Sequence, residues 1–135
     1  MTATRNLVPD ELRSSHVAGL FGAHFPLALE PAVYTFASML SRNYQGGYWH
    51  FYALGNGGFY MAPDAGTMFH VASDNGFEGV MTADALGITA CLYAYSHLSF
   101  SDIEGLAEAC ARHYHLLREH MMDHPEARAI LRAID

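Results

Sequence analysis

Nine histidines make a metal site the first chemistry to consider in this sequence of 135 residues. His120 and His124 are spaced i, i+4, and His113 lies one heptad before His120, so a helix would place all three on one face. Leu117 interrupts that face, and no HExxH pattern accompanies it. Imidazoles in the last turn of a helix also suit the negative end of its dipole. We therefore predict no metal site.

Nucleophilic catalysis and phosphate binding have equally little support. The sequence has no GxSxG elbow, and Cys91 and Cys110 stand among apolar residues of helix-like sequence. Ser96 and His97 are adjacent, which does not place the hydroxyl on an imidazole nitrogen. The glycine-rich stretch around Gly57 lacks the lysine and the following helix of a phosphate loop. We predict no catalytic residue, no cofactor, and buried free thiols at both cysteines.

The composition excludes several classes of protein. Hydrophobic residues make up 51% of the chain and charged residues 16%, which is typical of a folded domain and not of a disordered regulator. No apolar run approaches the ~20 residues that span a bilayer, and the N-terminus lacks the apolar segment of a secretory signal. We expect no membrane association and a single cytoplasmic domain over 1–135, of which 1–28 is only loosely placed.

The charge is negative but not organised. Fourteen acidic residues face seven arginines and no lysine, which gives a net charge of −7. Such a field repels phosphates, so we expect no direct binding of nucleic acid. A DNA mimic would need dense carboxylates at phosphate-like spacing, whereas the only modest cluster is Asp102, Glu104 and Glu108. That cluster is typical of the acidic opening of a helix.

Helices are predicted on both sides of a glycine-rich middle. Before the middle, a short helix opens near Pro9, an apolar connection is broken at Pro26, and a longer helix runs from Pro31 to the glycine pair at 46–47. After the middle, Thr82 caps a helix that is apolar all round and therefore central. The next helix opens at Ser101, with Ser101 and Glu104 as a capping box. A last short helix follows Pro125.

Four strands are predicted in the middle of the chain. They cover 48–54, 59–62, 68–72 and 77–81, and the turn residues at 55–58 and 73–76 join them in pairs. A small antiparallel meander of about four strands is the simplest arrangement. Together with the helices it gives an α+β fold.

Two stretches in this region resemble the signature of a known family. Residues 44–52 read Tyr-Gln-Gly-Gly-Tyr-Trp-His-Phe-Tyr, and residues 54–63 read Leu-Gly-Asn-Gly-Gly-Phe-Tyr-Met-Ala-Pro. They are similar to the pattern Y-x-G-G-x-W-x-F-Y, followed by N-G-G-x-x-M-A-P, of the ArdB/KlcA antirestriction proteins. Weaker similarities extend over 29–31, 95–97, 113–118, 124–126 and 134–135, so the resemblance covers about 29–135.

The resemblance implies a function that composition does not show. Proteins of this family are carried by plasmids and other mobile elements, and they relieve type I restriction-modification of incoming DNA without any established catalytic residue. It therefore implies a non-enzymatic inhibitor in the bacterial cytoplasm, acting by protein–protein contact on the type I complex or on an accessory host factor. The alternative is a small-molecule-binding or cryptic enzyme domain, which a pocket holding His50, His97 or tyrosines would favour.

Most signature residues have a structural interpretation. Glycines are needed where the backbone adopts a positive φ or approaches closely, and the large apolar side chains suit a core. The residues assigned to this structural role are Gly46, Gly47, Trp49, Phe51, Gly57, Gly58, Met61 and Pro63. The remaining polar and aromatic positions would share one strand face or the hairpin tip, as a candidate interaction patch. This patch is Tyr48, His50, Tyr52 and Asn56.

Overall fold

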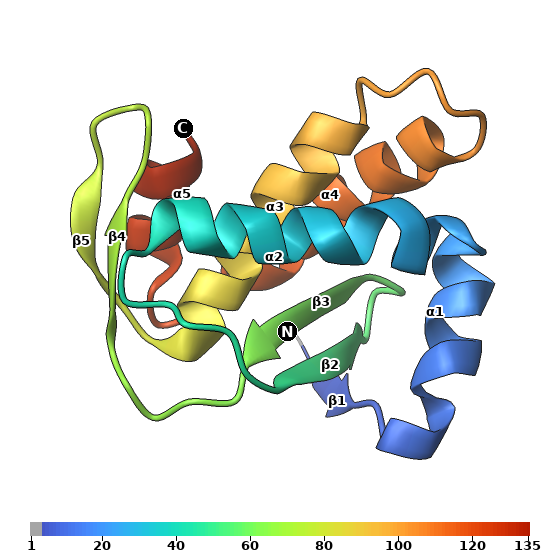
Figure 1. The fold of residues 1–135 in the computed structure, drawn as a ribbon, viewed down its shortest axis with the longest axis horizontal. Helices are drawn as coiled ribbons and strands as arrows, with labels where there is room; N and C mark the ends of the chain where they lie inside the picture. Colours follow the sequence, from blue (N-terminus) through green and yellow to red (C-terminus); the bar gives the residue numbers. More distant parts are fainter. Residues whose placement is uncertain (1–3) are drawn as a thin grey trace.

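A computed structural model of the chain describes residues 4–135, which form five α-helices and two small antiparallel sheets (Figure 1). The predicted α+β class is confirmed. In the view of Figure 1, the three-stranded sheet lies below α2, between α1 on the right and the two-stranded sheet on the left. No helix within residues 4–135 is long and apolar enough to cross a membrane.

The four predicted strands form, but they are divided between two sheets. The first sheet has the order β1-β2-β3 and the second consists of β4 and β5. The strands are β1 (Arg5–Leu7), β2 (Trp49–Leu54), β3 (Phe59–Pro63), β4 (Phe69–Ala72) and β5 (Glu78–Met81). In register, Tyr52 faces Tyr60 across β2 and β3, and Asn6 of β1 faces Ala53. The expected single meander is therefore interrupted between β3 and β4, and β1 is an addition that the sequence did not predict.

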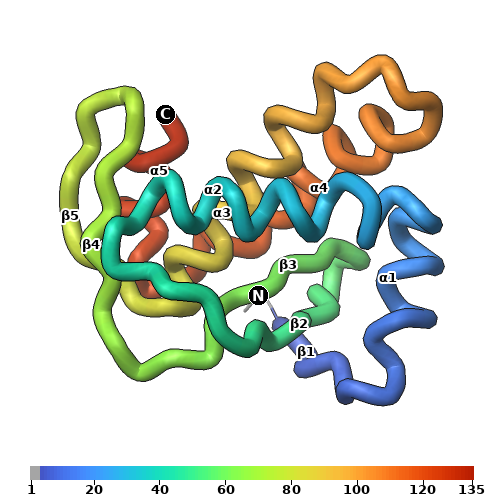
Figure 2. The backbone as a smooth tube through the Cα atoms, viewed as in Figure 1, coloured from blue at the N-terminus to red at the C-terminus, as the bar shows by residue number. Residues whose placement is uncertain are grey.

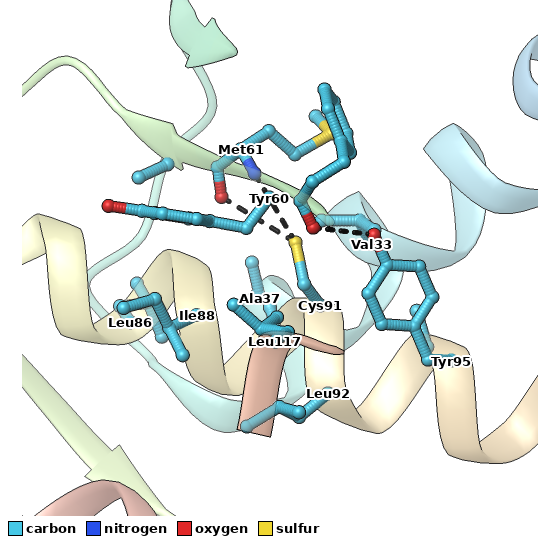
Figure 3. Packing of buried hydrophobic residues seen from close by; sticks show 14 of the residues in the cluster. Val33, Ala37, Tyr60, Met61, Leu86, Ile88, Cys91, Leu92, Tyr95 and Leu117 are labelled. Carbon is cyan, nitrogen blue, oxygen red and sulfur yellow. Dashed lines mark hydrogen bonds between the residues drawn. The ribbon is translucent and has the colours of Figure 1, made fainter. Parts of the chain in front are cut away.

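The meander is interrupted because helix α3 (Ala83–Leu98) occupies the outer edge of β3. A Cβ on Gly87 would lie 2.5 Å from the Met61 carbonyl oxygen, so only a glycine allows this approach. One turn further on, the Cys91 thiol lies 3.5 Å from the Met61 amide nitrogen and 3.6 Å from the Met61 carbonyl oxygen (Figure 3). Another turn on, the Tyr95 hydroxyl donates to the Phe59 carbonyl at 2.7 Å. Helix side chains thus replace a neighbouring strand.

The other helices surround α3. They are α1 (Arg13–Phe21), α2 (Glu30–Leu40), α4 (Leu106–Met121) and α5 (Ala127–Ile134). In the view of Figure 2, α2 crosses over α3, and α5 lies beside the β4–β5 hairpin. The Asn75 side-chain amide joins this hairpin to α5 by donating to the Arg132 carbonyl at 2.9 Å. The predicted central position of α3 is confirmed, since nearly all of its residues from 83 to 95 are buried.

Two helix boundaries and one connection differ from the prediction. Helix α2 ends at Leu40 and not near residue 45, because Ser41 is extended and forms a β-bridge with Val71. Helix α4 begins at Leu106 and not at Ser101, because Gly105 has a φ of 86° and Glu108 accepts from its amide at 3.0 Å. The predicted capping pair Ser101 and Glu104 is therefore not used. The connection through Pro26 is a π-helical turn, Phe25–Leu29, that leads directly into α2.

The core is built from aromatic rings as well as aliphatic side chains. Phe59 packs edge-on against Phe51 at 5.4 Å and against Phe25 at 5.8 Å between ring centroids. Both cysteines are free and buried, as predicted. Burial raises the pKa of the Cys91 thiol to about 12 and that of the Cys110 thiol to about 11, so both are inert at neutral pH.

Candidate functional site

Three of the four predicted patch residues form a row along the outer face of β2 and the residue that precedes it. Tyr48, His50 and Tyr52 alternate with the buried Trp49 and Phe51, as the period of a strand requires. The Tyr48 and His50 rings are 5.5 Å apart between centroids, and the His50 and Tyr52 rings are 6.2 Å apart. Tyr48 is 48% exposed. We call Tyr48, His50 and Tyr52 the aromatic row.

An arginine stacks on each end of the aromatic row. The Arg13 guanidinium lies 4.7 Å from the centre of the Tyr48 ring, and the Arg5 guanidinium lies 4.2 Å from the centre of the Tyr52 ring. Such contacts between a cation and an aromatic face are attractive. Arg13 also donates to the Tyr48 hydroxyl and the Trp49 carbonyl, both at 2.6 Å. The row is therefore held in place from both ends.

Carboxylates balance the two arginines on this surface. Tyr48 donates its hydroxyl proton to Asp10, and this hydrogen bond raises the pKa of Tyr48. His50 Nε2 lies 3.2 Å from an Asp64 carboxylate oxygen. The aromatic row thus presents polar tips of both signs, which suits recognition of another protein better than binding of a polyanion.

Asn56, the fourth predicted patch residue, lies apart from the aromatic row. Its side-chain oxygen accepts from the Gly58 amide at 2.9 Å, and its side-chain nitrogen donates to the Leu116 carbonyl at 2.8 Å. The first bond forms the hairpin turn, and the second ties this turn to α4. Asn56 therefore has a structural explanation.

The signature residues lie where folding needs them. Gly46, Gly47 and Gly57 have positive φ values of 85°, 112° and 91°. A Cβ on Gly58 would lie 3.0 Å from the Leu116 Cβ, so the hairpin approaches α4 closely. The large apolar members are buried: Trp49, Phe51, Met61 and Pro63. These φ values, contacts and burial support the predicted structural role of the signature, which stays a prediction.

A polar cluster that the sequence did not predict continues from the row. Asp84 accepts from Arg5 at 2.6 Å, from the Tyr60 hydroxyl at 2.8 Å and from His124 Nε2 at 2.8 Å. These residues come from β1, β3, the start of α3 and the turn before α5. The Tyr60 ring stacks on Tyr52 at 5.0 Å between centroids, which joins the cluster to the aromatic row.

The electrostatics of the cluster fix its protonation at neutral pH. Burial alone would raise the pKa of Asp84, but the hydrogen bonds from His124 and Tyr60 and the charge of Arg5 lower it below its usual value. Burial and the charge of Asp84 raise the pKa of Tyr60. Burial, together with the Arg5 charge, lowers the pKa of His120. The cluster therefore holds a carboxylate and a phenol, with a neutral His120 beside the Tyr60 ring.

The cluster lines a cavity of about 350 Å³ with His120, Asp123 and Pro125 at its wall. The His124 imidazole has no nitrogen left for proton transfer, because Nδ1 accepts from the Glu126 amide at 2.9 Å and Nε2 donates to Asp84. His120 remains the half-buried imidazole of this cavity. Among residues 4–135, no three histidine, cysteine or carboxylate side chains are placed to hold a metal ion.

The other histidines considered from the sequence lie elsewhere. His113 is buried against the Phe21 ring, 4.6 Å away between centroids, and does not face the cavity of His120 and His124. His97 lies against Phe36 of α2, 5.7 Å away between ring centroids, and does not line the cavity. No local sequence pattern indicates the polar cluster around Asp84, because its members are far apart in the sequence.

Comparisons of sequence place the chain among antirestriction proteins. The sequence profile of the family described as "Antirestriction protein" matches residues 42–135. "Antirestriction protein KlcA" of Escherichia coli is 42% identical over 135 residues, which cover 98% of this chain and 94% of that protein. "Uncharacterized protein YafX" of E. coli strain K12 is also 42% identical over 135 residues, with coverage of 95% and 85%.

A comparison of structures agrees. A solved structure from work on the KlcA and ArdB proteins matches this fold with a TM-score of 0.90 and 40% identity, and the match covers 100% of this chain and 96% of that one. Those proteins are described as having a novel fold and antirestriction activity against type I DNA restriction systems in vivo but not in vitro. The profile match includes the aromatic row and every signature residue. The chain belongs to the antirestriction protein family.

Proposed function

We propose that this protein relieves type I restriction of incoming DNA in the bacterial cytoplasm, as a non-enzymatic inhibitor that works through protein contact. The observation that carries the proposal is the match of the whole fold to the KlcA and ArdB proteins, for which activity against type I systems is described. At 40% identity and with a TM-score of 0.90 over the full chain, the backbone fold is retained.

The proposed partner is the type I restriction-modification complex or an accessory host factor. The KlcA and ArdB proteins are described as active in vivo but not in vitro. A protein that acts only in the cell depends on a component or a step that the purified reaction does not contain. This favours the host factor, or a stage such as DNA translocation, over simple blocking of the isolated enzyme.

The charges on the outer face of β2 support contact with a protein and not DNA mimicry. A mimic would present a continuous stripe of carboxylates. Here Arg5 and Arg13 alternate with Asp10 and Asp64 around aromatic rings. We propose the aromatic row as a contact surface, with the exposed Tyr48 as its leading residue.

The hydrogen bonds already made within the polar cluster support a non-enzymatic inhibitor. Asp84 already accepts three hydrogen bonds, and both nitrogens of His124 are occupied. A general base needs a free basic atom within reach of its substrate. The cluster instead joins four parts of the chain, which is a structural role.

The specific observation that favours a second function is the cavity beside His120. It holds about 350 Å³, and its half-buried His120 is neutral at pH 7 because its pKa is lowered. A small polar molecule would fit a cavity of this size. The alternative function is therefore binding or turnover of such a molecule at His120.

The test is the plating efficiency of unmodified phage on a type I restricting strain, with and without the protein. Wild-type protein is expected to relieve restriction, and modified phage serves as the control for effects unrelated to restriction. Tyr48→Ala is expected to weaken relief, whereas His120→Ala and the surface control Val80→Ala are expected to leave it unchanged. Thermal melts establish that each variant is folded. Loss of relief in folded His120→Ala, with Tyr48→Ala fully active, would replace this proposal by the alternative.

A further inference from the structure

The loop between α3 and α4, residues 99–105, projects from the body of the molecule (Figures 1 and 2). It carries two exposed apolar side chains within four residues, Phe100 at 88% exposed and Ile103 at 47%. The other large apolar side chains that are exposed in residues 4–135 are separated along the chain. Neighbouring apolar side chains exposed together on a projecting loop form a candidate contact surface.

The loop is held in shape by its own hydrogen bonds. The amides of Phe100 and Ser101 donate to the carbonyls of His97 and Leu98, at 3.3 and 3.0 Å, which extend the last turn of α3. The Ile103 amide donates to Ser101 Oγ at 3.1 Å. Leu106, which is completely buried, then anchors the start of α4. Because the loop is ordered before any partner arrives, binding would cost little conformational entropy.

The charged residues of the loop and of the first turn of α4 are all acidic. Asp102, Glu104 and Glu108 lie within the same stretch, and the sequence has no arginine or lysine between Arg42 and Arg112. The salt bridges found within residues 4–135 involve none of these three carboxylates. The loop therefore combines an apolar tip with acidic flanks that are not neutralised by ion pairs.

We propose that this loop docks into an apolar socket surrounded by arginine or lysine side chains on a protein partner. Phe100 and Ile103 would fill the socket, and the acidic flanks would pair with its rim. Proteins that handle DNA carry basic surfaces of this kind. The inference rests on the proposed function, since it names a second surface by which the inhibitor engages its target. It commits to a basic protein, because an anionic lipid surface or a second acidic copy of this chain would repel the loop.

The experiment compares three double variants in the type I restricting strain, each at titrated expression. The variants are Phe100→Ala with Ile103→Ala, Asp102→Asn with Glu104→Gln, and the matched control Leu27→Ala with Met39→Ala, whose side chains are 78% and 66% exposed in the wild type. The quantity measured is the protein level that gives half-maximal relief of restriction. Because all six residues are on the surface, thermal melts are expected to match the wild type.

The Phe100→Ala, Ile103→Ala variant is expected to need at least about tenfold more protein than the wild type for half-maximal relief. A tenfold change corresponds to about 1.4 kcal/mol of binding free energy. The charge variant is expected to need several-fold more, and the control no more than the wild type. Full relief by the folded apolar variant would overturn the inference while leaving the proposed function intact. A wild-type protein that gives no relief would instead overturn the proposed function, and the loop inference with it. Concentration-dependent dimerisation that is lost in Phe100→Ala would also overturn the inference, in favour of a second copy.

Discussion

Replacing Gly87 with alanine is the most direct test of how α3 packs on β3. A Cβ at this position would lie 2.4 Å from the Ala62 Cβ and 2.5 Å from both the Ala62 Cα and the Met61 carbonyl oxygen. Non-bonded carbon atoms are best separated by about 3.5 Å or more. The helix and the strand would therefore have to move apart by about 1 Å, and no flexible side-chain end is present to absorb the shift.

The expected loss of stability follows from three contributions. Overpacking costs about 1–3 kcal/mol. Moving the helix also weakens the hydrogen bond from Tyr95 to Phe59 and the thiol contact of Cys91 with Met61, at about 1 kcal/mol for a hydrogen bond. Alanine regains about 1 kcal/mol through its helix propensity. The net expectation is a loss of about 1–3 kcal/mol from a total stability of the order of 5–15 kcal/mol.

Urea unfolding followed by circular dichroism measures this loss, and Gly19→Ala is the matched control. Gly19 lies in α1, and a Cβ there would meet no atom within 4 Å. The same substitution is therefore expected to stabilise the protein by up to about 1 kcal/mol. Equal unfolding free energies for Gly87→Ala and the wild type would refute the idea that α3 packs directly on the backbone of β3.

Three further predictions concern buried and half-buried polar groups. Burial and the nearby Arg112 charge lower the pKa of His113 to about 4 from its usual 6.5, so the stability it confers is fully present above pH 6.5 and falls by up to about 3 kcal/mol as the pH decreases to 4. Urea titrations of the wild type and His113→Gln over that pH range check this, and parallel curves would contradict it. Asp84→Asn is expected to cost about 1–3 kcal/mol at pH 7, because Arg5 and His124 lose a charged acceptor. The pKa of Asp84 is lowered, so that stabilisation is present above pH 3.8 and is lost as the pH falls through the folded-state pKa. If the Asp84→Asn protein had wild-type stability but gave no relief of restriction, that result would argue for chemistry at the cavity. Tyr95→Phe removes the only hydrogen bond described for its hydroxyl, to the buried Phe59 carbonyl, and should cost about 1–2 kcal/mol in a thermal melt. The Tyr34 hydroxyl donates to Glu30 at a half-buried position, so Tyr34→Phe should cost less stability than Tyr95→Phe. A larger loss for Tyr34→Phe would contradict the idea that burial sets the cost of a lost hydrogen bond.

Local sequence patterns predict the helix caps and turns that are determined by residues adjacent in the sequence. The cap at Thr82, whose hydroxyl accepts from the Ala85 amide at 3.2 Å, follows from its position before a long apolar stretch. The β2–β3 hairpin follows from the glycines at its turn. At the start of α4, two capping pairs compete within one turn, and the positive φ of Gly105 decides between them. That choice cannot be made from residue types alone.

Long-range packing explains what the sequence did not predict. Strand β1 is three exposed residues with no periodicity, and it is defined only by its pairing with β2. The division of the meander depends on contacts of Gly87 with a strand some 25 residues earlier, at Met61 and Ala62. Alternation along β2 does predict that Tyr48 and Tyr52 share a face, but the direction of Asn56 depends on α4. The role of the aromatic row in binding remains a prediction.

The helix that covers β3 also limits aggregation. Among the described strands, open edges remain only on short elements: β1 has three residues, and β4 and β5 have four each. Ser41 already bridges β4 at Val71, and Glu78 places a charge on β5. Intermolecular strand addition needs a longer flat template of about six residues, so neither sheet offers a good starting point for fibrils. A concentrated solution of this protein is therefore expected to resist fibril formation.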